Sequence, residues 1–144
     1  MQTRSPLLAL LLLLASATAA RAQDAQLEQV LERFAAAWAR GDVAAIIELA
    51  PRSGLSIETE RGALGVLAQR QAAAAIRRIL EGRQTVTVRT GMAQVVGGSP
   101  PRAFGELTWV TRSRGTTATE RGVIFLALVK EGDRWRITQI RILR

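Results

Sequence analysis

The stretch LEQVLERFAAAWARGDVAAI, residues 27–46, decides the fold, because it places a long amphipathic helix directly before a short one. Its apolar side chains recur every three or four residues, which predicts one buried helical stripe over about 25–40; they are Leu27, Val30, Leu31, Phe34 and Trp38. Asp24 is the expected N-cap of this helix. Asp42 is expected to cap the short helix, which ends at Pro51 because proline cannot continue the hydrogen-bond ladder.

The rest of the chain changes from helical to strand periodicity. We expect a short strand at 55–59, a break at Gly62–Gly65 and a second long helix at about 63–81. From Gln84 onward the period is two, which predicts four long antiparallel strands separated by turns; their approximate ranges are 84–96, 104–112, 121–130 and 134–143. The sequence therefore predicts an α+β fold with two longer helices, one short helix, four long strands and one short strand.

One predicted strand differs from the others, because VIFLALV at 123–129 is apolar at seven consecutive positions. A strand with one face in water alternates apolar and polar side chains, so this strand is expected to be covered on both faces. Helices can cover one face. A second subunit is the simplest cover for the other, which predicts a homodimer formed through the outer face of the sheet.

The N-terminus has the three parts of a cleavable signal peptide over residues 1–22. Arg4 supplies the positive start, Leu7–Ala15 is an unbroken apolar run, and Ala20-Arg21-Ala22 is a small-residue cleavage pattern. The apolar run is shorter than the roughly 20 residues of a spanning helix. We therefore expect cleavage near Ala22, a periplasmic or secreted single domain over 23–144, and no stable membrane span after cleavage.

Residues 27–46 resemble the opening of the NTF2-like (SnoaL-like, ketosteroid-isomerase-like) superfamily, which has a cystatin-like α+β fold. GDRWRI at 132–137 is similar to the closing hairpin of that superfamily. The likeness is strongest to small exported bacterial members of unknown function, where a Gln-Ala pair, here Gln71-Ala72, lies in the long helix. The resemblance implies a cone: a curved antiparallel sheet wraps the long helix and leaves a pocket at its concave face, and members often dimerise through the outer sheet face. The superfamily contains enzymes, ligand binders and interaction modules, so the fold alone does not give the function.

The chain contains no His, Cys or Tyr. It thus lacks the commonest general base and zinc ligand, a thiolate nucleophile and a phenolic acid. We expect no metal, no cofactor and no catalytic residue, and hence a non-enzymatic domain that binds a small apolar ligand or a protein partner. The alternative is a glutamate-dependent isomerase or lyase that uses Glu106 or Glu58 as a buried acid. Strand parity does not say whether Glu106 faces the concave side or pairs with an arginine on the surface.

Six residues are candidates for lining an apolar ligand pocket, although the rings among them are more typical of a core; they are Phe34, Trp38, Gln71, Trp109, Phe125 and Trp135. The formal net charge of +8 favours anionic partners. Without Arg4 and Arg21 it becomes about +6.

A basic cluster of Arg70, Arg77, Arg78 and Arg83 lies on and after the predicted long helix. We interpret it as a solvated helix face with favourable charge at the C-terminal end. A surface that binds anionic envelope lipid or polymer is the alternative. Nucleic-acid binding is not expected, because few exposed aromatic residues are available for base stacking.

Overall fold

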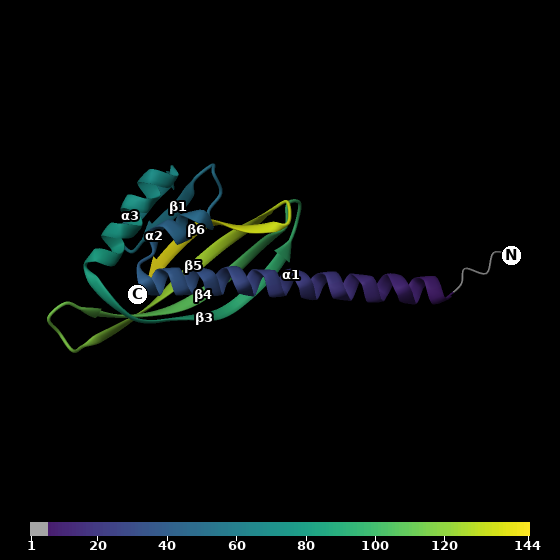
Figure 1. Ribbon diagram of the computed structural model, residues 1–144, viewed down its shortest axis with the longest axis horizontal. Helices are drawn as coiled ribbons and strands as arrows, with labels where there is room; N and C mark the ends of the chain where they lie inside the picture. The colour runs from purple at the N-terminus through teal and green to yellow at the C-terminus, as the bar shows by residue number, and fades with distance from the viewer. Residues whose placement is uncertain (1–5) are drawn as a thin grey trace.

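The computed structural model describes the backbone of residues 6–144 and the side chains of residues 17–144. The elements of the α+β fold follow in chain order (Figure 1): α1 (Pro6–Arg40), α2 (Val43–Glu48), β1 (Leu55–Thr59), β2 (Gly62–Leu67), α3 (Gln69–Glu81), β3 (Arg83–Gly97), β4 (Arg102–Ser113), β5 (Thr119–Glu131) and β6 (Arg134–Leu143). The charged start of the predicted leader and the side chains of its apolar run lie outside the described residues. Within the described part, no helix is both long and apolar enough to cross a bilayer.

The six strands form one curved, open sheet in the order β2-β1-β6-β5-β4-β3. The four long strands are antiparallel neighbours, as predicted. The short strand β1, whose direction the sequence leaves open, pairs in parallel with β6. Register shifts interrupt β3 at three places, including Thr85/Thr87 and Thr90/Ala93. Such bulges bend a strand, and in Figure 1 the sheet curves around α1.

The segment after β1 is the main correction to the predicted elements. The expected break at Gly62–Gly65 is part of strand β2, which pairs with β1 in a hairpin. The helix predicted from 63 begins only at Gln69. Val66 lies on β2, opposite Ser56, and its side chain is 74% exposed. Its apolar character therefore does not mark a buried helical face.

Helix α1 packs on the concave face of the sheet with the predicted stripe inward. Phe34 and Trp38 are fully buried and stack with ring centroids 5.3 Å apart. Trp38 also meets the edge of Trp109 at 5.4 Å. The helix lies close against the sheet at Gly105, where an added Cβ would lie 2.5 Å from Leu31 Cδ2.

Of the two predicted helix caps, one is confirmed and the other is wrong. Asp42 caps α2 as expected, because its Oδ1 accepts a hydrogen bond of 3.1 Å from the backbone N–H of Ala45. Asp24 is not an N-cap, because α1 continues through it from Pro6. The buried face of α1 nevertheless begins at Leu27, since the side chains of residues 17–22 are exposed.

The structure establishes which sheet face is concave. Leu107 and Trp109 are buried beneath α1, whereas Glu106 lies on the convex face and is partly exposed. The apolar strand β5 follows the same alternation. Its concave side chains are Ile124, Leu126 and Leu128, and its convex ones are Val123, Phe125, Ala127 and Val129.

Candidate ligand-binding pocket

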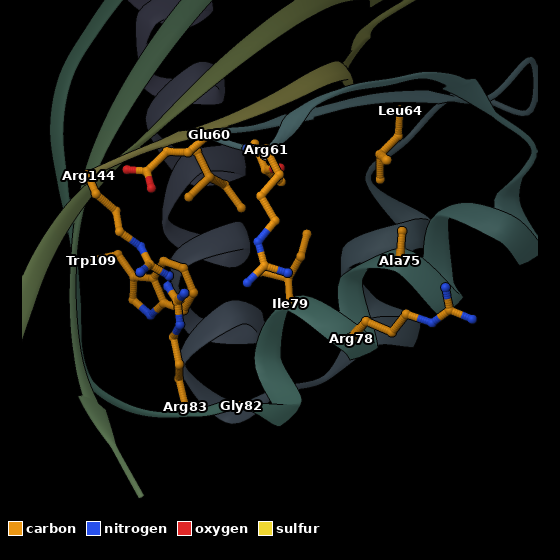
Figure 2. A pocket seen from close by; sticks show the side chains of 12 residues that line it. Glu60, Arg61, Leu64, Ala75, Arg78, Ile79, Gly82, Arg83, Trp109 and Arg144 are labelled. Carbon is orange, nitrogen blue, oxygen red and sulfur yellow. Dashed lines mark hydrogen bonds between the residues drawn. The ribbon is translucent and has the colours of Figure 1, made fainter. Parts of the chain in front are cut away.

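A pocket of about 520 Å³, here called the α3 pocket, opens between α3, the β1–β2 hairpin and the C-terminal end of β6 (Figure 2). Its walls come from four separate parts of the chain, which only the folded sheet brings together. The lining residues are Thr59, Glu60, Arg61, Leu64, Ala75, Arg78, Ile79, Gly82, Arg83, Trp109, Ile142 and Arg144.

The floor of the α3 pocket is apolar and rigidly held. Trp109 projects from the concave face of β4, is 2% exposed, and donates its indole N–H to Thr85 Oγ1 at 3.0 Å. This hydrogen bond and the contact with Trp38 fix the orientation of the ring. Ile79 from α3 and Ile142 from β6 complete the floor. Such a surface suits the apolar part of a small molecule.

The rim of the α3 pocket is cationic. Four of its lining residues are arginines and one, Glu60, is a carboxylate. In Figure 2 the side chains of Arg83 and Arg144 extend towards Trp109, and Arg61 extends from the hairpin towards Ile79. The Arg83 guanidinium carbon lies 5.8 Å from the Trp109 ring centroid, a cation–π distance.

The arginines of this rim differ in their partners. Arg144 Nη1 lies 3.4 Å from Glu120 Oε2, outside the pocket lining. In the part of the chain that the structure describes, the guanidiniums of Arg61 and Arg83 have no carboxylate within ion-pair distance. Positive charge therefore exceeds negative charge at the mouth of the pocket.

A second pocket of about 630 Å³, the α1 pocket, lies between α1, the end of α2 and the β5–β6 hairpin. Trp135 forms its base and is 3% exposed. Its lining carries charges of both signs, with two carboxylates (Glu48 and Asp133) and three arginines. One of these, Arg136, donates from Nη1 to the backbone oxygen of Glu48 at 2.8 Å. The remaining lining residues are Gln26, Gln29, Val30, Arg33, Leu49 and Arg134.

The structure does not gather the six predicted pocket residues around one cavity. Trp109 lines the α3 pocket and Trp135 the α1 pocket. Phe34 and Trp38 belong to the core behind Trp109 and line neither pocket, because both point from α1 into the sheet.

Gln71 and Phe125 also lie outside both pockets. Gln71 is exposed in the first turn of α3, and its Oε1 accepts a hydrogen bond of 3.4 Å from the N–H of Ala68. It therefore acts as a helix cap. Phe125 is on the convex sheet face, 38% exposed, because it alternates with the inward-facing Leu126.

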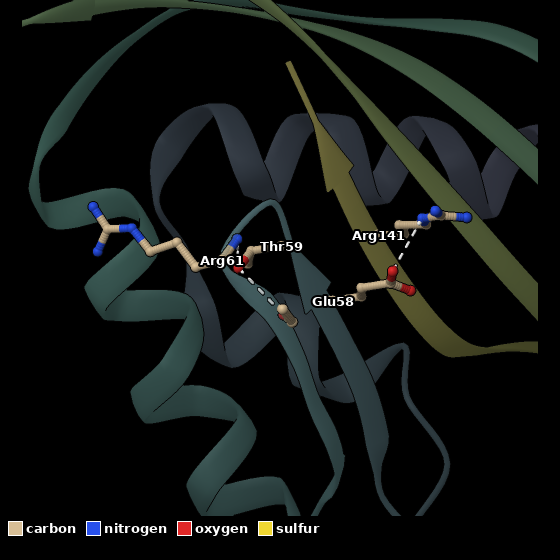
Figure 3. A network of polar contacts seen from close by, with 5 residues as sticks. Glu58, Thr59, Arg61 and Arg141 are labelled. Carbon is tan, nitrogen blue, oxygen red and sulfur yellow. Dashed lines mark hydrogen bonds and ion pairs between the residues drawn. The ribbon is translucent and has the colours of Figure 1, made fainter.

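Neither glutamate considered as a buried acid occupies a pocket. Glu106 is on the convex face, opposite Phe125 on β5. Glu58 pairs with Arg141, with Oε1 and Nε 3.4 Å apart and side chains 32% and 49% exposed (Figure 3). The carboxylate that does line the α3 pocket is its near neighbour Glu60. Among the described residues, no three acidic side chains gather as a metal site.

Sequence reasoning missed half of the arginine rim. The basic cluster already contained Arg78 and Arg83, both of which line the α3 pocket. No sequence pattern indicates Arg61 or Arg144, because the pairing of β1 with β6 that brings them near α3 has no local signal.

Comparison with known proteins rests on the fold alone. No family model matches the sequence, and no curated protein matches it. Solved structures match well. An NTF2-like protein with a cystatin-like fold from Novosphingobium aromaticivorans superposes with a TM-score of 0.64 at 15% identity, over 89% of this chain and 86% of that one. The protein has an NTF2-like fold.

Two further solved structures resemble this fold. One is an NTF2-like protein of unknown function from Shewanella oneidensis MR-1, with a TM-score of 0.60, 20% identity, and coverage of 81% of this chain and 95% of that one. The other is a hypothetical protein with a ketosteroid isomerase-like fold from Catenulispora acidiphila, in complex with trimethylamine; its TM-score is 0.62 at 17% identity, over 80% and 84% of the two chains.

Proposed function

We propose that this NTF2-like domain binds a small, largely apolar ligand in the α3 pocket. The observation that carries the proposal is the apolar floor of Trp109, Ile79 and Ile142 beneath an open cavity. Its volume of about 520 Å³ falls within the usual range of small-molecule sites, about 300–1,000 Å³. A protein of the same fold has been solved with trimethylamine, which supports a role for the fold in binding small organic molecules.

Binding rather than catalysis is the function that the side chains of the α3 pocket support best. Acid–base catalysis needs a positioned proton donor and acceptor. Glu60 is the one carboxylate of the lining, it is exposed, and the chain contains no His, Cys or Tyr to act with it. Neither Glu106 nor Glu58 lines the cavity, so the glutamate-dependent isomerase or lyase has less support than ligand binding.

Native mass spectrometry of the protein purified from its own host tests this proposal. The wild-type protein is expected to retain a small molecule. Ala75→Phe should abolish retention, because Ala75 lines the pocket and a phenyl group would fill it. Ala74→Phe is the matched control, since Ala74 is exposed on α3 and lines neither pocket. A wild-type protein without any bound molecule, or equal retention by both variants, would contradict the proposal.

A specific observation also favours a homodimer through the convex sheet face. Phe104 is 52% exposed and Phe125 is 38% exposed. They are diagonal neighbours across β4 and β5, because Phe104 pairs with Ala127 and Phe125 pairs with Glu106. Val123 and Val129 extend this apolar surface along β5. Exposed apolar patches of this kind are typical of interaction sites.

Light scattering tests the dimer. The wild-type protein is expected to have twice the mass of one chain, and Phe125→Glu is expected to reduce it to one. Val66→Glu is the control, because Val66 is 74% exposed on β2 at the far edge of the sheet. A monomeric wild-type protein, or an equal effect of both variants, would argue against this interface.

We also propose that the domain is exported and cleaved near Ala22, to the periplasm or the medium. The buried stripe of α1 begins at Leu27, so cleavage would remove none of the described core contacts. The intact mass of the host-purified protein should correspond to a chain that begins at about residue 23. A chain that still carries residues 1–22 would refute this.

A further inference from the structure

We propose that the ligand of the α3 pocket carries one anionic group, a carboxylate or phosphate ester, held by Arg61 and Arg83 above an apolar body. The inference deepens the proposed function and rests on it. It assigns the chemical class of the ligand and two binding residues, whereas the apolar floor alone would accept any hydrophobic molecule of suitable size.

The first argument is the unbalanced charge of the cavity. Four arginines and one glutamate line it, and Arg144 already has Glu120 as a partner. The guanidiniums of Arg61 and Arg83 have no carboxylate partner among the described residues. Guanidinium groups bind carboxylate and phosphate through paired N–H donors, and such charged hydrogen bonds are stronger than neutral ones.

The second argument is geometric. Arg61 comes from the turn between β1 and β2, and Arg83 from the start of β3, so they approach the cavity from different walls (Figure 2). Arg83 lies 5.8 Å from the centroid of the buried Trp109 ring, which restrains the guanidinium over the floor. An anionic group between these two arginines would leave its apolar substituent against Trp109, Ile79 and Ile142.

The α1 pocket also contains arginines, but its excess of positive charge is smaller, with three arginines against two carboxylates. Its lining includes Glu48 and Asp133, Arg136 is bonded to a backbone oxygen, and Arg136 Nε also lies 4.0 Å from Glu131 Oε2. It therefore provides a natural control: removing an arginine there lowers the net charge of the protein by the same amount without touching the α3 pocket.

Isothermal titration with four probes tests the inference: decanoate, decyl phosphate, decan-1-ol and inorganic phosphate. At least one of the two alkyl anions should bind about tenfold or more tightly than decan-1-ol, and inorganic phosphate alone should bind most weakly. Arg83→Gln and Arg61→Gln should each weaken binding of that anion by about tenfold and leave decan-1-ol unchanged. Arg134→Gln, in the α1 pocket, should change nothing. Circular dichroism melting confirms that each variant is folded.

The outcomes separate this inference from the proposed function. If decan-1-ol binds as tightly as both anions, the pocket binds apolar ligands but the anionic specificity is wrong. If Arg134→Gln weakens the anions as much as Arg83→Gln, overall charge rather than the pocket attracts them, which also overturns the inference and favours a general basic surface for anionic lipid or polymer. If none of the probes binds the folded wild-type protein, both the anionic specificity and the proposed ligand binding in the α3 pocket are wrong.

Discussion

The α3 and α1 pockets are similar in volume, about 520 and 630 Å³, but differ in chemistry. Each has a buried tryptophan at its base, Trp109 at 2% and Trp135 at 3% exposure. The indole N–H of Trp109 is bonded to Thr85, whereas that of Trp135 has no partner among the described residues. The α3 pocket combines an apolar floor with four arginines and one carboxylate, whereas the α1 pocket has three arginines and two carboxylates. Charge balance, more than volume, distinguishes the candidate binding site.

The largest expected effect concerns the core that supports the floor of the α3 pocket. Trp38→Ala should lower the free energy of unfolding by about 3–5 kcal/mol, because Trp38 is fully buried between Phe34 and Trp109. Urea denaturation measures this. Phe104→Ala, at a ring that is 52% exposed, should cost much less. Equal losses for the two variants would show that Trp38 does not support the core as described.

Gly105→Ala should affect the two pockets differently. The added methyl group pushes on α1, and α1 contributes lining residues to the α1 pocket but not to the α3 pocket. The new Cβ would lie 2.5 Å from Leu31 Cδ2, and such overpacking typically costs about 1–3 kcal/mol of stability. Ligand binding at the α3 pocket should persist in the folded variant, as measured by titration with decanoate.

Gly82→Ala is the matched control for this substitution. Gly82 lines the α3 pocket with open space around it and a φ of −78°, which alanine adopts easily. Alanine there should leave stability unchanged or raise it by about 0.4–1 kcal/mol. A destabilisation as large as that of Gly105→Ala would contradict the packing at the α1–sheet contact.

The smallest expected effect concerns the glutamate outside both pockets. Glu58→Gln removes the ion pair with Arg141, whose two side chains are 32% and 49% exposed. Exposed pairs contribute little, so the change in the free energy of unfolding should be below about 1 kcal/mol. Decanoate affinity should stay the same. A marked loss of affinity in titrations would assign Glu58 to the site after all.

The sequence predicted the elements whose pattern is local. The stripe of α1, the cap at Asp42 and the four long strands each have a strong periodic or capping signal, and the structure has them all. Strand β2 has no such signal, because it contains two glycines and its side chains from Gly62 to Val66 are exposed. Its existence depends on pairing with β1 rather than on its own residues.

The candidate site was predictable only in part. The size and strand position of Trp109 indicate a candidate pocket residue, and the place of Arg83 in a basic cluster indicates a candidate anion-binding residue. Strand parity could not say that Phe125 faces outward, since β5 is apolar on both faces. Arg61 reaches the cavity because β2 folds back on β1, and this long-range arrangement cannot be derived from local spacing.

The central claim, a ligand site at the α3 pocket with an anionic preference, is tested most directly through the three tryptophan indole N–H signals. They report separately on the α3 pocket, the α1 pocket and the core. In ¹H–¹⁵N spectra, whichever of decanoate and decyl phosphate binds more tightly should shift the Trp109 signal strongly and leave the Trp135 signal in place, and decan-1-ol at the same concentration should shift Trp109 far less. A shift confined to Trp135, no shift at all, or equal shifts of Trp109 with that anion and with decan-1-ol would contradict the account.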